Sequence, residues 1–168
     1  MAELNLRDKS RTAGRSGEKK RKWMDSFIPR RLEMLISPAW QRAPRPLLRL
    51  IERLEIEHLR HGGQNNGELY VSYPQFVAYG MSKKSIRSTL KLGEELGLLQ
   101  VIREERIIQG DIRPANCYRL TYVPAKGKQN PTDEWKCVTE ERAIALVGTY
   151  RVLEAKAVKA ERRAAACP

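Results

Sequence analysis

The sequence predicts a mostly helical α+β domain, and three observations lead to this fold class. Apolar residues recur at helical spacing over residues 46–61 and 83–96. Two runs rich in Val, Ile, Leu, Thr and Tyr follow at 98–106 and 117–123, as in a β-hairpin. Hydrophobic residues make up 41% of the 168 residues, which is enough for one modest core with tails.

We expect four regions along the chain: a disordered basic arm over 1–26, one folded domain over 27–124, a linker over 125–138 and a final helix over 139–166. The arm is too polar to bury the surface that would order it. Structure is expected to begin near Phe27, where apolar residues become frequent.

The long helix of the domain begins at about Pro46. One side of it is apolar at helical spacing: Leu47, Leu50, Ile51, Leu54 and His58. It stops at Gly62-Gly63, because glycine readily takes the left-handed conformation of a C-terminal cap. A small strand over 68–71 comes next.

Two further helices follow this strand. Ser72 and Gln75 form a capping-box pattern, which predicts a short helix over 73–79. Gly80 makes a turn, and Ser82 is placed to cap the helix over 83–96. Helix, small strand, helix, turn, helix and hairpin is the order of a winged helix-turn-helix domain.

The helix over 83–96 has two opposed sides. Ile86, Leu90 and Gly93 fall on one side, and Lys84, Arg87, Ser88 and Lys91 fall on the other. A cationic helix side of this kind fits the major groove of duplex DNA, where arginine, lysine and serine contact bases or phosphates. Amide groups at the start of the helix are expected to face a phosphate. The candidate DNA-binding residues here are Ser82, Lys83, Lys84, Ser85, Arg87, Ser88 and Lys91.

The hairpin supplies a second candidate contact. Arg103, Arg106 and Arg113 lie near its tip, where arginines can enter the minor groove or hold the flanking backbone. The alternative is that these charges only keep exposed strand ends soluble. Arg119 lies nearer the strand centre, and we expect a structural role for it.

The charge of the chain indicates its class of partner. Its formal net charge is +12, which favours a nucleic acid or an anionic membrane surface. No apolar stretch approaches the ~20 residues that span a bilayer, so we expect a cytoplasmic, nucleoid-associated protein with no membrane partner. We expect no cofactor and no metal, since the three cysteines are widely spaced and His58 and His61 lack further ligands.

The final helix carries a heptad-like seam, with apolar residues at alternating steps of three and four. Its members are Ala143, Leu146, Tyr150, Leu153, Ala157, Ala160 and Ala164. We expect this seam to form a homodimer; the alternative is that it docks on the chain's own domain.

The stretch LEIEHLRHGGQNNGELYVSYPQFVAYGMS, with SPAW before it and LGLL and YRLTY after it, resembles a family of small bacterial winged helix-turn-helix proteins of chromosomes and mobile elements. The resemblance covers about residues 27–122 and implies binding to double-stranded DNA. It places the recognition helix at Lys83, Lys84, Ser85, Arg87, Ser88 and Lys91. His58, His61, Gly62, Gly63 and Gly67 match the segment that joins the first helix to the small strand.

We therefore expect sequence-specific DNA binding by a bacterial transcriptional regulator. Two alternatives stay open, a plasmid or phage replication or maintenance factor and a protein-binding winged-helix adaptor. We do not expect an enzyme, because the sequence has no nucleophile-base pair, no glycine-rich phosphate loop and no carboxylates spaced to hold a catalytic metal.

Overall fold

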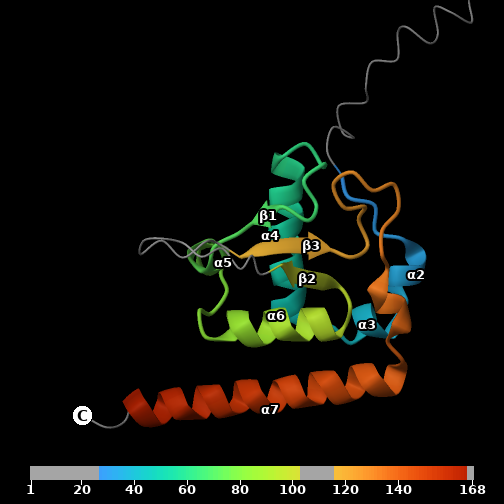
Figure 1. Cartoon of the computed structure of the whole chain (residues 1–168). Helices are drawn as coiled ribbons and strands as arrows, with labels where there is room; N and C mark the ends of the chain where they lie inside the picture. The colour runs from blue at the N-terminus through green and yellow to red at the C-terminus, as the bar shows by residue number, and fades with distance from the viewer. Residues whose placement is uncertain (1–26, 103–115, 166–168) are drawn as a thin grey trace, which may run out of the picture.

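Helices and one small sheet make up the part of the chain described by the computed structural model, residues 27–102 and 116–165, the last five by backbone alone (Figure 1). The predicted α+β, mostly helical fold class is confirmed, with about 55% of the described residues in helices. In chain order the elements are α2 (Leu32–Leu35), α3 (Pro38–Gln41), α4 (Arg45–Arg60), β1 (Leu69–Tyr70), α5 (Tyr73–Ala78), α6 (Ser85–Glu95), β2 (Leu99–Ile102), β3 (Cys117–Leu120), η2 (Glu134–Cys137) and α7 (Glu140–Ala165).

The three strands form an antiparallel sheet in the order β1-β3-β2. Tyr118 of β3 lies opposite Leu69 of β1 and Val101 of β2. β3 is shorter than predicted because the buried Asn66 side chain intervenes: its amide nitrogen donates to the carbonyl oxygens of Leu120 (2.8 Å) and Val123 (2.7 Å). The described part of β2 ends at Ile102, and residues 103–115 lie outside the described chain.

The core lies between α4, α6 and the sheet. Leu47, Leu50, Ile51 and Leu54 of α4 are fully buried, as the periodicity predicted. On the other side of the core, Phe76 packs edge-to-face on Tyr118, with their ring centroids 5.8 Å apart. Burial of this apolar surface is the main force that holds the helices on the sheet.

The two predicted helix caps have different outcomes. The capping box of α5 is present, with the Gln75 side chain accepting a hydrogen bond from the Ser72 amide at 2.7 Å. The cap predicted at Ser82 is wrong, because α6 begins at Ser85 and its N-cap, Lys84, is already helical in conformation. Ser82 contributes its carbonyl oxygen instead, which accepts from the Ser85 amide at 3.1 Å.

The second half of the predicted linker 125–138 packs onto the domain, whereas residues 126–130 are exposed. Trp135 and Val138 are buried. Arg119 holds this segment to the sheet by donating to Thr132 Oγ1 and Glu134 Oε1, both at 2.6 Å. The segment is therefore part of the fold, and the predicted structural role of Arg119 is confirmed.

The helix α7 runs alongside α6 in the opposite direction (Figure 1). Ala143, Val147 and Tyr150 are buried against the rest of the chain. The predicted seam therefore docks on its own domain over its first half, which was the alternative to a homodimer. The exposed residues 155–160 lie beyond this contact. Within the described residues, no helix has both the length and the apolar character needed to cross a bilayer.

Candidate nucleic-acid interface

The exposed side of α6 carries a row of three cations. Lys84, Arg87 and Lys91 are exposed, while Ile86 and Leu90 on the opposite side are buried. The predicted opposition of an apolar and a cationic side is thus confirmed. We name Lys84, Arg87 and Lys91 the cationic stripe.

The cationic stripe meets an acid at the C-terminal end of α6. Lys91 Nζ lies 3.7 Å from Glu95 Oε1, and the Lys91 side chain is 73% exposed. Such an exposed pair is weak and easily exchanged for another anion. The Glu94 carboxylate is held at the sheet, because its Oε1 accepts from the Val101 amide at 3.0 Å.

Two predicted contact residues do not belong to this exposed row. Ser85 is buried, and its hydroxyl donates to the Ser82 carbonyl at 3.0 Å. The Ser88 hydroxyl donates to Glu154 of α7 at 2.7 Å. Both hydroxyls are thus bonded within the chain, that of Ser88 to α7, and the DNA contacts predicted for Ser85 and Ser88 stay predictions. Ser82 and Lys83 are exposed in the turn just before α6.

A hollow of about 370 Å³ borders one side of the cationic stripe. Arg87 and Lys91 line it together with Tyr73 from the start of α5 and Asn116, which comes directly before β3. Tyr73 and Asn116 add hydrogen-bonding groups to the cationic surface. Sequence reasoning missed them because they come from elements that are adjacent only in the fold.

The helix α7 borders the other side of the stripe without covering it. Tyr150 Oη lies 3.2 Å from Thr89 Oγ1, and this contact fixes α7 against α6. A small hollow between the two helices is lined by Lys91 and Leu92 of α6 and by Leu153 of α7. The stripe thus lies between the β3 side of the domain and α7.

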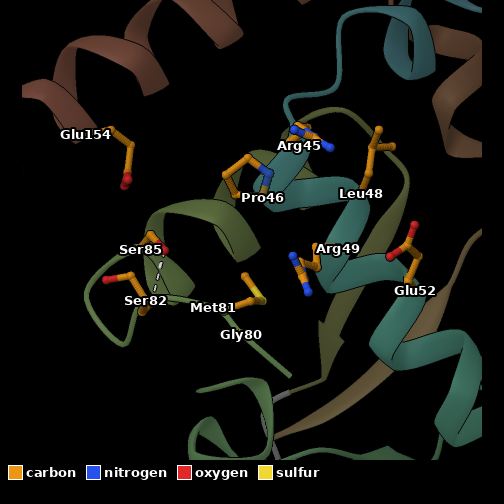
Figure 2. Close-up of a pocket in the computed structure, with 10 residues that line it drawn as sticks. All are labelled: Arg45, Pro46, Leu48, Arg49, Glu52, Gly80, Met81, Ser82, Ser85 and Glu154. Carbon is orange, nitrogen blue, oxygen red and sulfur yellow. Dashed lines mark hydrogen bonds between the residues drawn. The ribbon is translucent and has the colours of Figure 1, made fainter. Parts of the chain in front are cut away.

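A larger hollow, of about 570 Å³, lies between the start of α4, the turn before α6 and α7 (Figure 2). Arg49 reaches toward the turn, and its Nε donates to the Tyr79 carbonyl at 3.2 Å. Arg45, Glu52 and Glu154 also line this hollow. Two arginines face two carboxylates, so this hollow does not extend the cationic surface.

The remaining predicted site residues have separate outcomes. Arg103, Arg106 and Arg113 lie outside the described residues, as does the basic arm. His61 is exposed and its Nε2 lies 3.2 Å from Glu57 Oε1. In the described part of the chain, no three His, Cys, Asp or Glu side chains gather as a metal site would require.

The chain matches no protein-family model, no curated protein and no solved structure. Its function must therefore be inferred from its own residues and geometry. A row of exposed cations on a helix anchored by its opposite side can approach a polyanion as a rigid unit, with little ordering of the backbone on binding.

Proposed function

We propose that the chain is a winged helix-turn-helix protein that binds double-stranded DNA sequence-specifically, with α6 as its recognition helix. The observation that carries this proposal is the cationic stripe, exposed on one side of a helix whose other side is buried in the core. The element order from α4 to β3 and the β1-β3-β2 strand order also support it.

The turn between α5 and α6 gives the recognition helix a defined direction. Gly80 has a φ of +89°, a conformation that glycine adopts at little steric cost. Met81 is buried directly after it, and its amide donates to the Phe76 carbonyl at 3.1 Å. The turn is thus anchored in the core, and it fixes the orientation of α6 relative to the rest of the domain.

The dimensions and charges of α6 fit the major groove. An α-helix with side chains is about 10–12 Å across and the groove about 12 Å wide. Arg87 lies in the middle of the stripe and is the residue we assign to a guanine edge. Lys84 and Lys91 then face the phosphates on either side. Glu94 and Glu95 disfavour deep insertion of the C-terminal end of α6, so the N-terminal half reads the bases.

The role we propose for this binding is regulation of transcription in a bacterium. Genome-wide recovery of bound fragments, followed by footprinting at a stated salt concentration, tests it. Sites at promoters support regulation. Repeated sites clustered at a replication origin would assign the same surface to replication or maintenance of a plasmid or phage.

DNA recognition itself is tested on the best site selected from random duplexes, by fluorescence anisotropy. We expect Arg87→Ala to weaken binding by about 1–3 kcal/mol and to relax the preference at one base pair. The matched control is Arg60→Ala, which changes an exposed arginine at the end of α4 that lies far from α6 (Figure 1). Equal effects of the two substitutions would contradict α6 as the recognition helix.

A further inference from the structure

The side of α7 that faces away from α6 is exposed and apolar in its middle. Val152 is 54% exposed and Ile144 is 51% exposed. The exposed positions along this side follow alternating steps of four and three, the spacing of a coiled-coil seam. They are Glu141, Ala145, Gly148, Val152, Ala155 and Lys159, and we name them the outer seam.

The outer seam is distinct from the side of α7 that docks on the domain. Ala143, Val147 and Tyr150 point inward and are buried. At 100° per residue, the outer seam lies on the opposite side of the helix from them. A side chain at Gly148 would meet no atom within 4 Å, so this part of the outer seam is open.

The ends of the outer seam carry opposite charges, and this determines which partner fits. If a second copy of α7 is laid antiparallel, Glu141 lies opposite Lys159 of that copy, and Lys159 lies opposite its Glu141. The same register places Ala145 opposite Ala155 and Gly148 opposite Val152. Small residues therefore face each other or a single branched side chain, which lets the two helices approach closely. A parallel pair would instead place like charges together at both ends.

We propose that two copies of the chain form a two-fold homodimer by antiparallel pairing of their outer seams. The partner is a second copy because the charge and size pattern is complementary to itself. Each α7 then has one side on its own α6 and the other side on the second α7. The dimer buries the exposed apolar surface of Val152 and Ile144, which supplies its driving force.

This dimer also positions the two recognition helices, a consequence that rests on the proposed function. The two α6 helices are separated by three helix-packing distances of about 8–10 Å each, or roughly 24–30 Å in total. This approaches the ~34 Å of one DNA turn that separates half-sites for paired recognition helices. A two-fold axis perpendicular to the paired α7 helices leaves both cationic stripes on the same side.

Sedimentation equilibrium of the full chain without DNA tests the proposal. We expect a monomer–dimer equilibrium over the micromolar range. Val152→Glu should raise the dissociation constant at least about tenfold, because it places two carboxylates in the apolar middle of the outer seam. Leu153→Glu is the matched control: Leu153 is similarly exposed, at 50%, but projects toward α6, so the dimer should persist.

Charge reversal tests the antiparallel register. Glu141→Lys and Lys159→Glu should each weaken the dimer by about three- to tenfold, because each change creates two like-charge pairs. The double variant should restore the affinity. A chain that stays monomeric throughout, a dimer that Val152→Glu leaves unchanged, or a double variant no tighter than the single ones would overturn the proposal. Circular dichroism checks that each variant keeps its helix content.

The two proposals fail separately. If the dimer is absent but Arg87→Ala weakens DNA binding, only the dimer proposal fails. If the charge-reversal pattern holds while no duplex is bound, the DNA-binding proposal fails and the dimer stands.

Discussion

Gly97 is the residue at which the turn after α6 meets the segment before α7. Its φ is +66°, and a Cβ atom added there would lie 2.7 Å from the backbone carbon of Glu134 and 2.7 Å from the backbone nitrogen of Trp135. Real Cβ atoms do not approach the backbone this closely. Gly97 is thus required both for its conformation and for the close packing of residues 134–135 on the domain.

We expect Gly97→Ala to lower the free energy of unfolding by about 2–4 kcal/mol, combining left-handed strain with a backbone clash. Gly127→Ala is the matched control. Gly127 also has a positive φ, of +73°, but a Cβ atom there would meet nothing within 4 Å. That substitution should cost only about 1–2 kcal/mol. Urea denaturation measures both, and equal losses would show that the packing against Glu134 contributes nothing.

His58 is a buried titratable group at the end of α4. It is 3% exposed, and its Nδ1 has no hydrogen-bond partner among the described residues. Burial lowers the pKa of His58 below its ordinary value near 6.5, although the nearby Glu55 opposes this change. The native state therefore holds His58 neutral at a pH where the unfolded chain takes up the proton.

We expect the free energy of unfolding to fall as the pH is lowered from 7 to 5, by less than about 1.4 kcal/mol per pH unit from this one group. The sign follows because the unfolded state binds more protons than the native state in this range. His58→Leu should flatten the dependence between these pH values. Denaturation at closely spaced pH values measures this, and an unchanged slope in the variant would assign the dependence to other groups.

Glu57 contributes to stability in a separate, more acidic range. Burial raises the pKa of Glu57, but hydrogen bonds from Arg53 and His61 lower it, and the net change is a decrease from the ordinary value of 4.5. The resulting stabilisation is present above that pH and disappears as the pH falls further. The contributions of His58 and Glu57 can therefore be separated by measuring the free energy of unfolding as a function of pH.

At the scale of elements, local sequence patterns predicted the helices, whereas non-local contacts determined where β3 ends and which element packs beside α6. The periodicity of α4 and α6 is a property of their own residues, so their buried sides were predictable. The end of β3 depends on Asn66, more than 50 residues away along the chain. Ser88 was assigned to DNA because nothing in α6 itself indicates that Glu154 of α7 lies beside it.

The docking of α7 could not have been decided from its spacing. A heptad-like seam indicates that one side of a helix packs against another element. It does not indicate whether that element belongs to the same chain or to a second copy. Tyr150 resolves this in the structure, since it is 6% exposed and its hydroxyl contacts Thr89 of α6. The exposed side of α7 has a weaker apolar pattern in the sequence, because it carries alanine and glycine in place of leucine.

We expect Tyr150→Ala to destabilise the chain by about 3–4 kcal/mol, because it removes a buried aromatic ring and leaves a cavity between α6 and α7. Tyr150→Phe should cost only about 1 kcal/mol, since it removes the hydroxyl contact and keeps the ring. Thermal unfolding of the two variants measures both losses of stability. Equal losses would show that α7 is held by the hydroxyl rather than by apolar burial.

At the scale of the whole molecule, the sequence predicted the fold class and the cationic helix, but not which segments belong to the fold. Residues 125–138 are polar and contain proline, which is typical of a linker. Their packing depends on single distant partners, Arg119 for Glu134 and Arg31 for Asp133. Such partners cannot be identified from local composition, because each is a charged residue that composition alone places on the surface.

The fold begins with two anchored arginines. Arg30 Nε donates to Glu55 Oε1 at 3.0 Å, and the Arg31 guanidinium lies 5.9 Å from the centre of the Trp135 ring. The Tyr122 hydroxyl donates to the same Glu55 oxygen at 2.6 Å, so this buried carboxylate has two partners. The basic segment before residue 27 can therefore be removed without touching these contacts.

Deleting residues 2–22 should weaken binding to every duplex by a similar factor. The deleted segment contains a set of cationic residues: Arg7, Lys9, Arg11, Arg15, Lys19, Lys20, Arg21 and Lys22. For each of these cations that binds a phosphate in the full chain, the deletion should reduce the slope of log affinity against log salt concentration by about 0.9. The sequence preference should be kept, because phosphate contacts carry no base information.

Arg87→Ala should behave in the opposite way, with a relaxed sequence preference and little change in the salt slope. Titrations of the selected site and of a scrambled duplex at several salt concentrations separate the two variants. If the deletion abolishes the preference while Arg87→Ala keeps it, base recognition lies in the basic segment. The cationic stripe of α6 would then be only a phosphate-binding surface.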